Sequence, residues 1–137
     1  MSLVTDLKLF LSPLNRQIFP GMATNIRVHT GFGEQHAKTA KDILAAVKYA
    51  LLKSGFNQVT LVGHSLGAAL SVLDGVYLSL NLPGVKFQVI GYGMPRVGNQ
   101  AFADYVDANI PVTRINNRND FIPVLPRTSI PMVYFIL

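Results

Sequence analysis

The chain has 137 residues, half of them hydrophobic and 14% charged, and its formal net charge is +5. This composition is typical of one folded domain and excludes an intrinsically disordered chain. The absence of cysteine excludes a disulfide framework and a thiolate metal site. No apolar run approaches the roughly 20 residues of a membrane-spanning helix. Residues 1–10 lack the basic start and long apolar centre of a signal peptide.

The basic residues are dispersed along the chain rather than gathered in blocks with interleaved aromatic residues. Four of them, Lys38, Lys41, Lys48 and Lys53, fall on one predicted helix. This pattern favours a solvated surface over a nucleic-acid interface, so we expect no nucleic-acid partner.

In chain order, the first half predicts a turn at 19–21, a short strand at 25–29 and a break at 31–33. A helix is expected from about Glu34 to Lys53, because apolar residues recur there at spacings of three and four. These residues are Ala37, Ala40, Leu44, Val47 and Leu51. Gly55 is a suitable C-terminal stop for this helix.

The second half predicts strands and helices in alternation. The expected elements are a buried strand at 58–62, an almost wholly apolar helix at 66–80, a strand at 86–92, a more exposed helix at 100–109 and a short strand at 111–116. Such alternation predicts an α/β fold with a mostly parallel sheet flanked by helices.

Residues 63–67 read Gly-His-Ser-Leu-Gly, between the buried strand and the apolar helix. This strand–turn–helix context is the one that a nucleophile elbow needs, with Ser65 as the nucleophile. The amide of Leu66 would then point toward a developing oxyanion. The alternative is an ordinary βα turn in which Ser65 only caps the helix.

A serine nucleophile needs a base, usually a histidine that a carboxylate orients. Asp120 follows a predicted strand in the polar loop 117–120, and it could be that carboxylate or a turn residue bonded to its own backbone. None of the three histidines in the sequence is predicted to be the general base. His29 and His64 are expected to be structural, packed or hydrogen-bonded, and His36 is expected on the surface.

Four segments carry a resemblance to a known family: 28–32, 59–70, 91–99 and 116–126. With them the chain resembles the fungal class 3 lipases, α/β-hydrolases that cleave triacylglycerols and related esters, over about residues 6–127. The resemblance implies that Ser65 is the nucleophile, Leu66 an oxyanion donor through its amide, and Asp120 the triad carboxylate. It implies no metal and no organic cofactor.

The resemblance also implies a partial domain over residues 1–127, followed by a divergent apolar tail at 128–137. In the family, a second oxyanion donor precedes the matching segments and the catalytic histidine follows them. We therefore expect a truncated α/β-hydrolase that is incomplete as a catalyst.

The function that the resemblance implies is serine ester hydrolysis of acylglycerols in lipid metabolism, at a lipid–water interface. An extracellular location is implied because members of the family are commonly secreted. One alternative is a non-catalytic relic of the fold that binds lipid or a partner chain. Another is an esterase that acts on smaller or aromatic esters.

Overall fold

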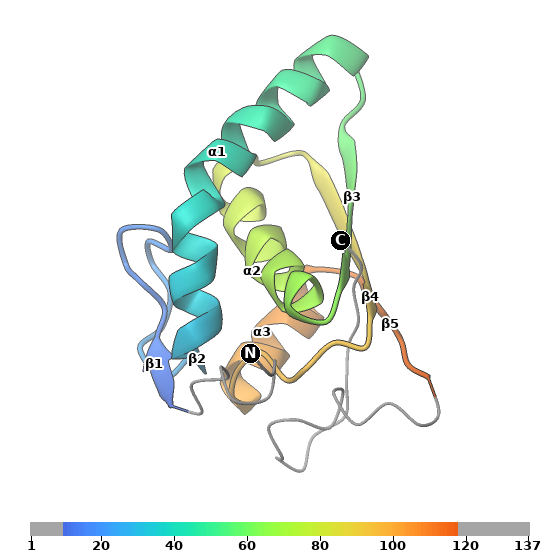
Figure 1. The fold of residues 1–137 in the computed structure, drawn as a ribbon. Helices are drawn as coiled ribbons and strands as arrows, with labels where there is room; N and C mark the ends of the chain where they lie inside the picture. Colours follow the sequence, from blue (N-terminus) through green and yellow to red (C-terminus); the bar gives the residue numbers. More distant parts are fainter. Residues whose placement is uncertain (1–9, 118–137) are drawn as a thin grey trace.

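A computed structural model describes residues 10–117 of the chain (Figure 1). Its elements are β1 (Leu11–Pro13), β2 (Arg27–His29), α1 (Thr30–Ser54), β3 (Gln58–His64), α2 (Leu66–Asn81), β4 (Lys86–Tyr92), α3 (Gln100–Asn109) and β5 (Val112–Ile115). Strands β3, β4 and β5 form a parallel sheet in that order, and β1 pairs with β2 in an antiparallel ribbon. The predicted α/β fold, with a parallel sheet flanked by helices, is confirmed.

Helix α2 lies between α1 and the parallel sheet (Figure 1). Ten of its residues are buried, as expected for a helix that is apolar on nearly all sides. Gly75 lets this helix approach the sheet closely, because a Cβ atom there would lie 3.2 Å from Val89 and 3.5 Å from Ile110. The core of the molecule is therefore centred on α2.

Residues of the sheet alternate between a face that packs on α2 and an open face, where side chains are half-buried or exposed. Leu61, Phe87 and Val89 are buried core residues on the strands that contact α2. Their neighbours along each strand turn to the other face. On that face, Gln88 Nε2 donates a hydrogen bond of 2.8 Å to Thr60 Oγ1.

The predicted start of the first long helix is wrong. We expected the helix to begin near Glu34, after a glycine break, but α1 begins at Thr30 and runs through Gly31 and Gly33. Each glycine costs a helix about 1 kcal/mol, whereas burying a phenylalanine contributes about 1.5–3 kcal/mol. Phe32, between the two glycines, is only 2% exposed. Burial of this ring offsets most of the glycine cost.

The expectation for His36 is also wrong, because its side chain is buried rather than on the surface. It is 1% exposed, and its Nε2 lies 2.9 Å from Oδ1 of Asp74, which is itself buried on α2. The rings of Phe19 and Tyr77 pack on the imidazole, with centroids 5.4 and 5.7 Å away. His36 shares a face of α1 with Phe32, four residues earlier, and this face packs inward. The His36–Asp74 pair therefore ties α1 to α2.

A second contact between distant segments joins the start of α3 to the segment before β2. Asn99 caps α3 by accepting a 3.0 Å hydrogen bond from the Phe102 amide, and its Nδ2 donates to the Asn25 carbonyl oxygen at 2.7 Å. Gly98 precedes this cap and forms an isolated bridge with Val28. A Cβ atom at Gly98 would lie 2.9 Å from Phe102 Cβ and would overlap the Arg27 carbonyl oxygen.

We predict that breaking the His36–Asp74 pair destabilises the fold through the group left unpaired. Losing one partner of a buried pair costs about 3–5 kcal/mol, so His36→Phe should lower the melting temperature by roughly 10–20 °C. The double variant His36→Phe/Asp74→Leu should lose much less than the sum of the two single variants. Circular dichroism melts check this, with exposed His64→Gln as the control. Additive losses would contradict the coupling.

We expect Gly98→Ala to be strongly destabilising, because its methyl group would meet backbone that cannot move aside without breaking the Asn99 cap. Overpacking of this kind costs about 1–3 kcal/mol. Urea unfolding measures the loss of free energy, and Gly33→Ala is the matched control. Neither Gly33 nor Gly98 has a left-handed φ, and a Cβ atom at Gly33 would lie 3.5 Å from Val28 Cγ2, an ordinary van der Waals contact. A Gly98→Ala variant as stable as the parent chain would overturn the packing argument.

Partial burial and the nearby Asp104 carboxylate raise the pKa of Asp107. A carboxyl whose pKa is raised on folding stabilises the native state at low pH, and that contribution is lost as the pH rises through the folded pKa. Asp107→Asn should therefore raise the melting temperature at pH 7, by about 2 °C for an exposed site. The difference should vanish near pH 3, and the melts would contradict this if it grew instead.

Candidate active site

Ser65 lies between the end of β3 and the start of α2, at the carboxyl edge of the parallel sheet. Its backbone angles are φ 53° and ψ −116°. Within residues 10–117 it is the one non-glycine residue with a positive φ. Non-glycine residues in such strained conformations cluster at functional sites. The backbone therefore has the sharp strand-to-helix turn that a nucleophile elbow requires.

Backbone hydrogen bonds hold this turn on both sides. The Ser65 amide donates to the Tyr92 carbonyl oxygen at 2.9 Å, which extends the pairing of β3 with β4. The amides of Ala68 and Ala69 donate to the Ser65 carbonyl oxygen at 3.1 and 3.2 Å. The serine is thus fixed to the neighbouring strand and to its own helix at once.

Arg114 on β5 stabilises the same end of the sheet. Its guanidinium Nη2 donates to the Met94 carbonyl oxygen at 2.7 Å. The Gly93 amide donates to the Ile115 carbonyl oxygen at 2.9 Å. These bonds hold the loop after β4 against β5. No periodicity in the sequence signals them.

The Ser65 side chain is 7% exposed. Ser65 is at the N-cap position of α2, but its side chain makes no cap hydrogen bond there, so the alternative of a capping serine gains no support. Among the residues that the structure describes, its hydroxyl has no hydrogen-bond partner. Leu66 is the first residue of α2, and its amide is one of the four N–H groups at the helix start that lack an intrahelical acceptor. Such amides favour nearby negative charge.

Within the described part of the chain, no histidine side chain forms a hydrogen bond with Ser65. His29 is buried with its ring 6.0 Å from that of Phe32, as expected of a structural residue. The Nε2 of His36 is engaged by Asp74. His64 is exposed, which corrects the expectation that it is packed. It follows the buried Gly63 in the alternation of β3 and so turns to the open face.

The predicted carboxylate, Asp120, lies outside the described residues, so its position relative to Ser65 stays a prediction. The same holds for the whole of the predicted tail at 128–137 and for the boundary of the expected domain at 127.

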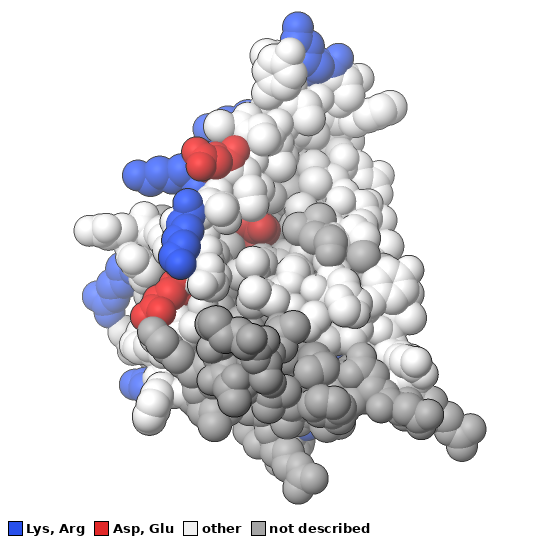
Figure 2. Space-filling view, viewed as in Figure 1, with Lys and Arg blue, Asp and Glu red and all other residues white. Residues whose placement is uncertain are grey.

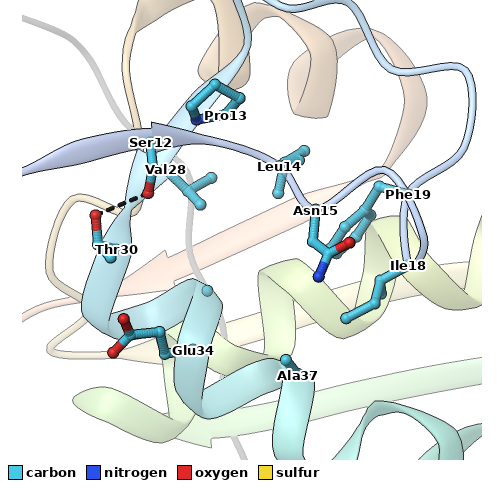
Figure 3. Close-up of a pocket in the computed structure, with 11 residues that line it drawn as sticks. Ser12, Pro13, Leu14, Asn15, Ile18, Phe19, Val28, Thr30, Glu34 and Ala37 are labelled. Carbon is cyan, nitrogen blue, oxygen red and sulfur yellow. Dashed lines mark hydrogen bonds between the residues drawn. The ribbon is translucent and has the colours of Figure 1, made fainter.

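A hollow of about 180 Å³ lies between the segment that follows β1 and the first turns of α1 (Figure 3). Leu14, Ile18 and Phe19 line its apolar part, and Ser12 donates a 2.7 Å hydrogen bond to Thr30 at its edge. No residue of the elbow lines it. The hollow is therefore separate from the turn that holds Ser65.

Residues 10–117 contain no group of three or more His, Cys, Asp or Glu side chains arranged to hold a metal ion. No helix in this part of the chain combines the length and the apolar character needed to cross a membrane.

Comparison with known proteins places this geometry in a family. Residues 1–130 match the family described as lipase (class 3). The chain is 30% identical over 123 residues to a secreted mono- and diacylglycerol lipase of Malassezia globosa, covering 88% of this chain and 40% of that protein. It is 37% identical over 100 residues to secreted mono- and diacylglycerol lipase 1 of Fusarium solani, covering 72% of this chain and 29% of that protein.

Among solved structures, a triacylglycerol lipase from Penicillium expansum superposes with a TM-score of 0.82 at 26% identity, covering 96% of this chain and 51% of that one. Lipase II from Rhizopus niveus gives a TM-score of 0.81 at 29% identity, covering 90% and 46%. The chain thus spans about half or less of the length of each relative named here. By sequence and by fold, the chain belongs to the class 3 lipase family.

Proposed function

We propose that this chain carries the nucleophile of a serine ester hydrolase that acts on acylglycerols. The observation that carries the proposal is the strained, buried Ser65 at the carboxyl end of β3. Parallel sheets of this kind place reacting groups at that edge. The relatives named as mono- and diacylglycerol lipases or as a triacylglycerol lipase support the substrate class.

In the proposed reaction, Ser65 Oγ attacks the ester carbonyl carbon while a general base takes the hydroxyl proton. The carbonyl oxygen becomes an oxyanion, and the Leu66 amide donates a hydrogen bond to it. The base then gives its proton to the departing alcohol, which leaves an acyl-serine. Water attacks the acyl carbon by the same route, releasing the fatty acid and restoring the serine hydroxyl.

The proposed carboxylate that orients the base is Asp120, which follows Ser65 in the chain order that α/β-hydrolases use. We propose that the base is not one of the three histidines of these 137 residues. His36 is already bonded to Asp74, and His29 packs against Phe32. The related proteins are longer than this chain, so we propose that the base is supplied by sequence outside it.

The proposed setting is a lipid–water interface outside the cell. The support is that the Malassezia and Fusarium relatives are named as secreted lipases. Secretion of this chain is tested by looking for the protein in the medium of the organism that encodes it.

We predict that the purified 137-residue chain hydrolyses a short-chain nitrophenyl ester no faster than its Ser65→Ala variant. A general base is worth about 10²–10⁴-fold in rate, and one oxyanion donor about 10²–10³-fold. A form that includes the flanking coding sequence should hydrolyse diacylglycerol. Ser65→Ala in that longer form should abolish the activity, while Ser71→Ala, a buried serine whose hydroxyl bonds the Gly67 carbonyl, should not.

Three outcomes would contradict the proposal in different ways. Rapid turnover by the 137-residue chain that is lost in His64→Gln would show that the base is within this chain. Activity of the longer form that survives Ser65→Ala would remove the nucleophile assignment. A folded longer form without esterase activity would favour the non-catalytic alternative.

A further inference from the structure

The end of α1 presents a cluster of large apolar side chains to solvent. Tyr49 is 63% exposed, Leu52 82% and Phe56 74%. Lys48 and Lys53, each next to one of these residues in the sequence, are also exposed. We call these five residues the α1 tip. Isolated exposed apolar residues are ordinary in proteins, but a cluster with basic neighbours marks an interaction surface.

Helix geometry explains why these side chains gather. Tyr49, Leu52 and Lys53 are three and four residues apart, so they share one face of α1, opposite to the face that buries His36 and Ala40. The Lys53 ammonium lies 5.5 Å from the centroid of the Tyr49 ring, a cation–π contact.

The turn after α1 adds an aromatic ring to the cluster. Gly55 ends the helix with φ 72°, and its amide donates to the Leu51 carbonyl oxygen at 3.0 Å. This left-handed stop is the usual helix terminator. It holds Phe56 directly beyond the last turn, so the ring extends the apolar surface of the tip.

The charge around the tip has a single sign. No aspartate or glutamate occurs between Ile43 and Leu73, and Lys86 lies beside the tip because its amide donates to the Asn57 carbonyl oxygen at 2.8 Å. Figure 2 shows lysine and arginine side chains along the outer edge of the molecule over α1, with acidic side chains among them further down but none at the end of that helix. The surface is therefore both apolar and basic.

We propose that the α1 tip docks the protein on an anionic lipid–water surface. Leu52 and Phe56 would enter the region between headgroups and acyl chains, where Tyr49 also fits. Lys48 and Lys53 would stay at the headgroups, and each lysine close to an anionic surface strengthens binding about fivefold. A nucleic-acid partner would instead favour basic side chains that follow a groove, whereas the tip is a protruding surface that ends in Leu52 and Phe56.

The tip lies at the opposite end of the sheet from the candidate nucleophile. Strand β3 begins at Gln58, just after Phe56, and ends at His64, next to Ser65. Seven residues of strand span roughly 20 Å. Docking through the tip is thus independent of ester hydrolysis and turns the Ser65 edge away from the docked surface.

The test is co-flotation of the 137-residue chain with vesicles of phosphatidylcholine, with or without about 30 mol % phosphatidylserine. We expect binding to the anionic vesicles only, weakened by high salt. Lys48→Gln/Lys53→Gln should weaken it about 25-fold, and Leu52→Ser/Phe56→Ser at least tenfold. Ser65→Ala should bind like the parent chain.

Matched controls sit at the other end of the described structure. Phe10→Ser removes a side chain that is 80% exposed, and Arg16→Gln/Arg27→Gln removes two exposed charges. Both should change vesicle binding less than twofold. Unchanged melting curves would establish that each variant is folded.

Several results would overturn the proposal. They are absence of vesicle binding, equal binding to neutral vesicles, or equal losses in the tip and control variants. A dimer in sedimentation velocity that Leu52→Ser/Phe56→Ser dissociates, without any vesicle binding, would instead assign the tip to a second copy of the chain.

Discussion

The burial of α2 on two sides is the constraint on which the rest of the structure depends. This helix has no polar face, so it is stable only when another element covers each side of it. The parallel sheet covers one side, at a distance that Gly75 makes short, and α1 covers the other. The cost is one buried carboxylate, Asp74, which the helix carries into the core. The imidazole of His36 satisfies this carboxylate and thereby fixes α1 as well.

This constraint also explains how a strained serine is held. A positive φ at a non-glycine residue costs on the order of 1–3 kcal/mol and persists only where its surroundings fix the backbone. Ser65 is bonded to the end of β4 before it and to the first turn of α2 after it, and α2 cannot shift without uncovering its apolar side chains. Arg114 and the end of β5 hold the next loop on the same edge. A candidate nucleophile on such rigid elements keeps its geometry before substrate arrives.

Parallel strands start at one edge of a sheet and finish at the other, so the fold separates two chemically different ends. The carboxyl end has the buried Ser65 and the Leu66 amide at the start of α2. The amino end has the α1 tip, with exposed lysines and apolar side chains. A protein attached to a surface through that tip would present the Ser65 edge to the opposite side. Surface attachment and ester hydrolysis share no residue, so a substitution can alter one without altering the other.

The sequence by itself determined the local features of this protein. Alternation and helical spacing predicted β4 and α3 at their observed bounds, and β3 and α2 within two residues, and residues 63–67 predicted the turn at Ser65. These features depend on residues close together in the chain. Only the tertiary structure decided that α1 begins at Thr30, that His36 is buried and that His64 is exposed. Each of these depends on an element distant in sequence, because a helix or strand pattern shows which residues share a face but not what that face meets.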